Sequence, residues 1–172
     1  IGKELAKALK HFTPNIFGIK KNVKTKDNYI KKIHNLFEMP KIINKMDIIV
    51  NLLPDNKETK QVFNKKIFKK MKKNCIFINL GRGETVNEKE LQYFISQKKI
   101  GSVGLDVFDR ETNYINVYQP LKKTSKFLNF ENIIITPHVA NITNTYWKKQ
   151  IELFSNNIEK FKKNKKMQNI LY

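Results

Sequence analysis

Three side chains of different chemistry could form one acid–base site, although they lie far apart in the sequence. They are Arg82, Glu111 and His138, and each follows a short run of apolar residues. A guanidinium group can hold a carboxylate through two parallel hydrogen bonds, and an imidazolium can give a proton to an oxygen near neutral pH. A carboxylate beside the imidazole would orient it and favour its charged form. Together the three residues, each just past a different predicted strand, make an enzyme site the leading hypothesis.

Parallel β-strands are the elements predicted to position these side chains. Residues 76–80 and 101–107 are apolar runs, and a glycine-containing turn and an amphipathic helix at 87–97 connect them. This arrangement is typical of a βαβ unit, and such units build parallel sheets. Ligands of open parallel sheets bind outside the carboxyl ends of the strands, which is where Arg82, Asp106 and Glu111 fall. We therefore predict an α/β fold with an enzyme site at that edge.

The remaining elements are predicted from the spacing of apolar residues. Further strands, each with an apolar centre, are expected at residues 15–20, 47–53 and 133–135. Helices, each with one apolar face, are expected at residues 1–9, 65–73 and 143–163, with one helical turn within 40–46. The helix at 87–97 begins at Asn87 with Glu90 three residues later, which is a capping-box arrangement.

Three segments call for separate predictions. Weak periodicity in residues 24–37 predicts a short helix that carries His34 on its surface. Residues 112–130 have no clear period and are expected to form a loop at the edge of the site. The helix at 143–163 has an apolar stripe, which predicts packing in a core or an interface. The stripe consists of Trp147, Ile151, Phe154, Ile158 and Phe161.

Composition narrows the class of protein. The 172 residues carry a formal net charge of +19, from 34 Lys and Arg against 15 Asp and Glu. Most of these cations are lysines scattered along every predicted helix, without a zinc-finger or RNA-binding signature, so a solvated surface is favoured over a nucleic-acid site. A single cysteine, Cys75, excludes an internal disulfide and favours a cytoplasmic compartment. We expect no membrane span and no metal site, because no long apolar run or metal-ligand spacing occurs.

Four motifs, in order along the chain, resemble those of the D-isomer-specific 2-hydroxyacid dehydrogenases. They are Asn51-Leu52-Leu53-Pro54 with Glu58-Thr59, Asn79-Leu80-Gly81-Arg82-Gly83, Gly104-Leu105-Asp106-Val107-Phe108 with Glu111, and Thr136-Pro137-His138-Val139-Ala140. The first motif has the form common in the glyoxylate/hydroxypyruvate reductase branch of that family.

The resemblance implies a Rossmann-like doubly wound parallel sheet that forms the family's NAD(P)-binding domain. Residues 1–172 would be one partial domain of this kind, without an internal boundary and without the separate substrate domain. Gly2 would be the third glycine of the G-x-G-x-x-G turn, so the first strand and most of that turn are expected upstream of this sequence. Because pyrophosphate binds the backbone N–H groups of that turn, we expect the piece alone to bind cofactor poorly and to be inactive.

The resemblance also implies roles for individual residues. His138 would be the acid–base residue, Glu111 would orient it, and Arg82 would anchor the substrate carboxylate during reduction of a small 2-oxo acid. A homodimer is expected from the same likeness. The positions that would contact the cofactor are Gly2, Lys20, Lys21, Leu53, Pro54, Thr59, Gly81, Arg82, Asp106 and His138.

The cofactor and the function each leave alternatives. Lys20 and Lys21 stand where an acidic residue would bind the ribose 2′-hydroxyl of NAD, and they favour the 2′-phosphate of NADP, although NAD stays open. A D-lactate or phosphoglycerate type of dehydrogenase is an alternative within the family. A dinucleotide-sensing binding protein on the same fold, or a nucleic-acid-binding lysine surface, would be a different class of function.

Overall fold

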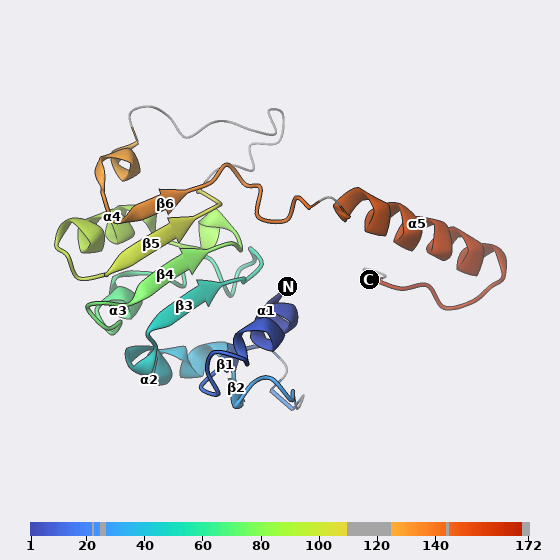
Figure 1. Ribbon diagram of the computed structural model, residues 1–172, viewed down its shortest axis with the longest axis horizontal. Helices are drawn as coiled ribbons and strands as arrows, with labels where there is room; N and C mark the ends of the chain where they lie inside the picture. Colours follow the sequence, from blue (N-terminus) through green and yellow to red (C-terminus); the bar gives the residue numbers. More distant parts are fainter. Residues whose placement is uncertain (22, 25–26, 110–124, 144, 170–172) are drawn as a thin grey trace. The chain divides into compact units, whose positions relative to one another are not determined.

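Short parallel strands form two sheets in the computed structural model (Figure 1). The structure describes residues 1–21, 23–24, 27–109, 125–143 and 145–169. One sheet pairs β1 (Phe17–Ile19) with β2 (Lys32–His34). The other sheet has the order β3-β4-β5-β6, with β3 at Ile48–Asn51, β4 at Ile76–Asn79, β5 at Ser102–Leu105 and β6 at Ile133–Ile135. The predicted parallel α/β sheet is confirmed.

The division into two sheets follows the strand order of a doubly wound fold. Such a sheet runs 3-2-1-4-5-6, with the first strand of the fold at its centre. In the part of the chain that the structure describes, β1 and β3 belong to different sheets, and no strand links the two sheets. The two-stranded sheet therefore corresponds to positions 3-2 and the four-stranded sheet to the strands from position 4 onward, as expected for a sequence that lacks the fold's first strand.

The apolar faces expected for the helices at 65–73 and 87–97 are buried, but the face expected at 1–9 is largely exposed, with Ile1 at 83% and Ala6 as the buried residue of that helix. The described part of residues 1–100 contains four α-helices. They are α1 (Gly2–Leu9), α2 (Met39–Ile42), α3 (Lys65–Phe68) and α4 (Glu88–Ser96). Leu91, Phe94 and Ile95 of α4 are buried, and the Phe68 ring lies 5.7 Å from that of Phe94 and 5.9 Å from that of Phe77 on β4. Cys75 is fully buried in the same core, and burial raises the pKa of its thiol to about 11.

Only one of the two hydrogen bonds of the capping box expected at the start of α4 forms. The Asn87 side chain accepts a hydrogen bond from the backbone N–H of Glu90, 3.2 Å away. The Glu90 carboxylate instead accepts from the backbone N–H of Lys65 at 2.6 Å, and the N–H of Asn87 donates to the carbonyl of Phe63. Glu90 therefore links α4 to the start of α3, because the tertiary donor competes with the local one.

The predicted helix at residues 24–37 is wrong, and so is the surface position of His34. Residues 32–34 are strand β2, and His34 is buried with 6% of its surface exposed. Its ring lies 6.3 Å from that of Phe17, and its Nδ1 lies 3.5 Å from a carboxylate oxygen of Glu38. The strand forms because its backbone pairs with β1, and a pairing between distant residues leaves no local periodicity.

The described residues group into two compact units, Ile1–His138 and Val139–Tyr172. The second unit contains α5 (Tyr146–Lys162), the helix expected at the end of the chain. Its apolar stripe is exposed, with values from 41% at Ile158 to 70% at Trp147.

None of the described helices combines the length and the hydrophobicity that crossing a membrane requires. Before β6, residues expected in a loop include a short 3₁₀ helix, Lys126–Asn129.

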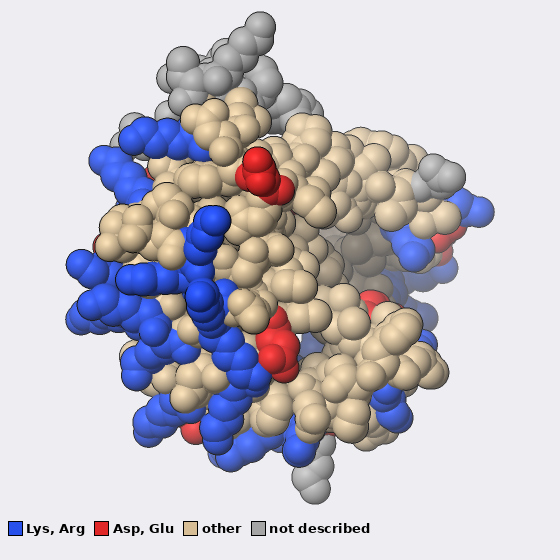
Figure 2. Space-filling model, turned by 60° about the vertical axis from the view of Figure 1, so that its left-hand side comes forward, with Lys and Arg blue, Asp and Glu red and all other residues tan. Residues whose placement is uncertain are grey.

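Basic side chains gather on the left-hand and lower parts of the face shown in Figure 2, with few carboxylates among them. Of the lysines that the structure describes, all but Lys160 are exposed. Their ion pairs include Lys72 with Asp47, at 2.6 Å. Such exposed pairs contribute little to stability, so the arrangement agrees with a solvated basic surface.

Candidate active site

Three neighbouring strands deliver predicted site residues to the same edge of the sheet. Arg82 follows β4, Asp106 follows β5 and His138 follows β6. The N–H of Asp106 donates to the carbonyl of Asn79 at 3.0 Å, and the N–H of His138 donates to the carbonyl of Asp106 at 2.8 Å. Backbone hydrogen bonds thus continue past the strands and hold these segments side by side.

His138 has a strained backbone that is consistent with a functional position. Its φ of 54° lies in the left-handed region, which residues other than glycine adopt rarely. Strain of this kind persists where the surrounding structure enforces it, and it is concentrated at functional sites. Two contacts hold the segment: the His138 N–H bond to Asp106, and the Thr136 hydroxyl, which donates to the buried Asp106 carboxylate at 2.5 Å.

Arg82 is exposed between two glycines that pack against other strand ends. A Cβ on Gly81 would lie 2.6 Å from the carbonyl oxygen of Leu53, just past β3. A Cβ on Gly83 would lie 1.8 Å from the carbonyl carbon of Phe108, just past β5. Both glycines are therefore needed for contact with the protein's own backbone, and they place Arg82 between the ends of β3 and β5.

Gly83→Ala is expected to destabilise the full-length protein by about 3 kcal/mol or more, because the added methyl group meets backbone that cannot move aside easily. Gly104→Ala is the matched control, since its Cβ would meet only the Ile78 side chain, at 3.4 Å. The control should change the free energy of unfolding by less than about 1 kcal/mol. Urea unfolding of both variants measures the difference, and equal stabilities would contradict the packing described here.

A buried polar network holds the turn that carries Arg82. Asn51 and Asn79 end β3 and β4 at paired positions, and the Asn51 side-chain amide donates to the Asn79 side-chain oxygen at 2.9 Å. The same amide donates to the Thr85 hydroxyl at 2.7 Å. All three residues are at most 1% exposed. We expected no role for these side chains.

The expected cofactor loop lies beside this turn. The Thr59 hydroxyl donates to the carbonyl of Pro54 at 2.6 Å and accepts from the N–H of Asn56 at 3.0 Å, so it closes the loop after β3. The N–H of Leu53 donates to the Asn51 side chain at 3.1 Å. A Cβ on Gly2 would lie 3.4 Å from the Leu52 side chain, which places the first turn of α1 at the same strand end.

The two lysines after β1 approach the same loop. The N–H of Lys20 donates to the carbonyl of His34 at 2.9 Å, which extends the pairing of β1 with β2. The Lys21 ammonium lies 3.5 Å from the Glu58 carboxylate. The Lys21 and Glu58 side chains are 89% and 64% exposed, so this ion pair is weak, and another anion could displace Glu58 from Lys21. Lys21 therefore lies beside the loop that follows β3, and Gly2 lies against Leu52 at the start of that loop.

Glu111 lies outside the described residues. Two residues earlier, the N–H of Asp109 donates to the Glu88 carboxylate in the first turn of α4, at 2.6 Å. Glu88 was not among the predicted site residues. It holds the backbone of Asp109, four residues after the end of β5.

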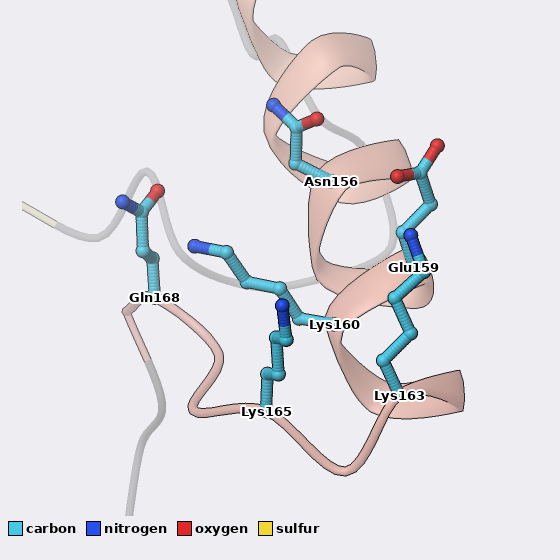
Figure 3. Close-up of a pocket in the computed structure, with 6 residues that line it drawn as sticks. All are labelled: Asn156, Glu159, Lys160, Lys163, Lys165 and Gln168. Atoms are coloured by element: carbon cyan, nitrogen blue, oxygen red, sulfur yellow. The ribbon is translucent and has the colours of Figure 1, made fainter.

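A hollow of about 300 Å³ lies in the C-terminal unit, between the last turns of α5 and the segment after it (Figure 3). Two hydrogen bonds at 2.9 Å between Asn157 and Gln168 hold that segment. Lysines dominate the lining, and none of its residues was expected to act in chemistry. The lining residues are Asn156, Glu159, Lys160, Lys163, Lys165 and Gln168.

Asn51, Asn79 and Thr85 were missed although the sequence held a signal for two of them. An asparagine stands near the end of each of two apolar runs, Asn51 within 47–53 and Asn79 within 76–80. A buried amide must find hydrogen-bond partners, and two such residues at matching positions of neighbouring strands can serve one another. Thr85 carried no comparable signal, because its role depends on the three-dimensional path of the turn.

The chain is similar to known proteins in sequence and in fold. The chain is 41% identical over 106 residues to a probable 2-ketogluconate reductase of Dictyostelium discoideum, covering 62% of this chain and 29% of that protein. It is 36% identical over 106 residues to glyoxylate/hydroxypyruvate reductase B of Enterobacter sp. (strain 638), covering 62% of this chain and 30% of that protein. The matched part therefore spans about 30% of these curated relatives.

A solved structure extends the likeness to nearly the whole chain. The probable 2-hydroxyacid dehydrogenase from Rhizobium etli CFN 42, in complex with NADP, HEPES and L(+)-tartaric acid, superposes with a TM-score of 0.83 at 26% identity. The match covers 99% of this chain and 52% of that one. Residues 1–140 also match the family described as D-isomer specific 2-hydroxyacid dehydrogenase, NAD binding domain. The chain therefore belongs to the D-isomer-specific 2-hydroxyacid dehydrogenase family, through its NAD-binding domain.

Proposed function

We propose that the longer protein containing this chain reduces a small 2-oxo acid to the 2-hydroxy acid with NAD(P)H. In this proposal residues 1–172 contribute the cofactor domain, and a separate substrate domain lies elsewhere in the protein. The observation that carries it is the gathering of Arg82, Asp106 and His138 at the carboxyl ends of the adjacent strands β4, β5 and β6. That edge is where ligands of parallel α/β sheets bind.

Each residue would do one part of the work. The reduced nicotinamide, when bound, supplies a hydride to the carbonyl carbon. Arg82 holds the substrate carboxylate through its planar fork of donors and polarises the neighbouring carbonyl oxygen. His138 gives a proton to that oxygen as its negative charge develops, so the product is a neutral hydroxyl. Glu111 would contact the other ring nitrogen of His138 and keep the imidazole charged and oriented.

The described residues suit the two ends of a dinucleotide. At the nicotinamide end, the buried Asp106 lies next to His138 through the backbone bond between them. At the adenosine end, the loop that Thr59 closes lies beside Lys21 and Gly2. The pyrophosphate between them would bind backbone N–H groups of the glycine turn, of which this chain contributes Gly2.

The glyoxylate/hydroxypyruvate type of substrate is the form we favour. It is supported by the motif at 51–54 and by the names of the curated relatives, which include a glyoxylate/hydroxypyruvate reductase. A D-lactate or phosphoglycerate substrate is the alternative within the family. A dinucleotide-sensing role without turnover is less well supported, because Arg82, Glu111 and His138 are all present in the sequence.

The direct test is an assay of the full-length protein with NADPH and with NADH. Glyoxylate, hydroxypyruvate, 2-ketogluconate and pyruvate would be offered as substrates, and nucleotide oxidation would be followed by absorbance. Turnover of one of these acids supports the proposal. A protein that binds NADPH but oxidises it with none of them would support the sensing role instead.

The preference for NADP depends on Lys21 in this proposal. In the full-length protein, Lys21→Ala is expected to raise KM for NADPH about tenfold and to leave KM for NADH nearly unchanged, because only NADPH has a 2′-phosphate to pair with the ammonium. Lys41→Ala, another exposed lysine but on α2, is the matched control. Equal effects of Lys21→Ala on the two nucleotides would contradict the assignment.

A further inference from the structure

The turn between β4 and α4 is held by more buried polar contacts than its length requires. The carbonyl oxygen of Arg82 accepts two hydrogen bonds, from the Thr85 hydroxyl at 2.6 Å and from the Asn79 side-chain amide at 3.2 Å. The N–H of Gly81 donates to the side-chain oxygen of Asn79 at 3.1 Å. Groups on both sides of the Arg82 Cα are therefore fixed by buried side chains.

Asn51 completes this network from the neighbouring strand. Its amide donates to the Asn79 oxygen and to the Thr85 hydroxyl, and its own oxygen accepts from the N–H of Leu53. The Thr85 hydroxyl thus accepts a hydrogen bond from Asn51 and donates one to the carbonyl of Arg82. These bonds join the ends of β3 and β4 to the Arg82 turn.

The same network reaches the segment that carries His138. The backbone carbonyl of Asn79 accepts from the N–H of Asp106, whose carbonyl accepts from the N–H of His138. Asn79 is therefore bonded toward Arg82 through its side chain and toward His138 through its main chain. Its position relates the two groups that, in the proposed reaction, hold the substrate and give it a proton.

Sheet stability alone does not account for these side chains. Burying an amide or a hydroxyl costs free energy unless every partner is satisfied, and an apolar residue at the same place would avoid that cost. A fully satisfied network instead fixes one conformation, which a catalytic group needs because a misplacement of about 1 Å can cost about a hundredfold in rate.

We propose that Asn51, Asn79 and Thr85 are positioning residues that hold Arg82 in the orientation that binds the substrate carboxylate. This inference rests on the proposed function, because it assigns Arg82 to that carboxylate. The three side chains act through the Arg82 backbone and do not touch the substrate themselves.

Thr85 offers the sharpest test, because its hydroxyl can be removed without changing its shape. In the full-length protein, Thr85→Val is expected to lower kcat/KM for the 2-oxo acid about tenfold, mainly through KM for the acid, while KM for NADPH stays within about twofold. Thr85→Ser retains the hydroxyl and should restore kcat/KM to near the native value. Thr85→Ala removes the same hydroxyl without placing a methyl group against Asn51, and it serves if Thr85→Val does not fold.

Amide hydrogen exchange of residues 79–86 gives a second measurement that does not depend on turnover. Thr85→Val should speed exchange in this segment relative to Thr85→Ser, because the turn loses one of its ties. If Thr85→Val matches Thr85→Ser in kcat/KM and in exchange, the inference is overturned although the proposed function stands. If the native protein turns over no 2-oxo acid, the proposed function fails, and the exchange result alone decides whether the network fixes the Arg82 turn.

Discussion

In the full-length protein, Arg82→Ala is expected to lower kcat/KM for a 2-oxo acid about a thousandfold, and Arg82→Lys about a hundredfold. Alanine removes both the charge and the donors. Lysine keeps the charge, but its three donors radiate from one nitrogen and lack the planar fork that matches the two oxygens of a carboxylate while also reaching the carbonyl oxygen. The large loss with lysine is the informative result, because a site that needed only positive charge would tolerate it.

The composition of the chain makes Arg82 stand out. Only two of its 34 basic residues are arginines, at positions 82 and 110, and the rest are lysines. Lysine serves every other described cationic position, including the exposed faces of the helices. The general preference for lysine therefore does not explain the arginine at position 82. We infer that this position, between two glycines that pack against neighbouring strand ends, requires the planar guanidinium group.

Steady-state kinetics of the two Arg82 variants, with and without added guanidinium ion, measure this effect. Free guanidinium should partly restore turnover by Arg82→Ala, because it can occupy the space of the lost side chain and bind the same carboxylate. Rescue would not be expected if Arg82 only supported the fold. Native activity in Arg82→Lys would mean that the site needs only a positive charge at this position, and native activity in Arg82→Ala would remove Arg82 from the proposed mechanism.

The four-stranded parallel sheet could be predicted because the sequence of each strand and helix shows a local pattern. β4 and β6 are apolar runs that end in turn residues, and α4 has a clear apolar face. β2 could not be predicted, because it exists through its pairing with β1 and its own residues alternate weakly. His34 was misplaced for the same reason, since a residue's burial depends on what packs over it.

Some features of the site follow from local sequence patterns, and others depend on contacts between residues that are far apart in the sequence. The types and order of Arg82, Asp106 and His138 were readable in the sequence, because each follows a recognisable strand. The close packing of Gly83 on Phe108 and the network of Asn51 with Thr85 were not readable. Both join segments more than twenty residues apart, and neither leaves a periodic trace.

His138→Asn is expected to lower kcat about a thousandfold in the full-length protein, with little change in stability. The amide side chain cannot give a proton to the developing alkoxide, so that charge would be left to Arg82 and to solvent. The backbone should be retained, because His138 has a φ of 54° and asparagine adopts this left-handed conformation more readily than most residues.

His138→Ala separates the two properties of this position, which are the proton-donating side chain and the left-handed backbone. It should lose the same activity as His138→Asn but should also destabilise the protein by about 1 kcal/mol more, because alanine pays the full cost of the left-handed backbone. His11→Asn, at an exposed histidine after α1, is the matched control and should leave kcat unchanged. Steady-state kinetics of the three variants measure kcat, and urea unfolding measures their stability. A native kcat in His138→Asn would mean that the proton comes from another group.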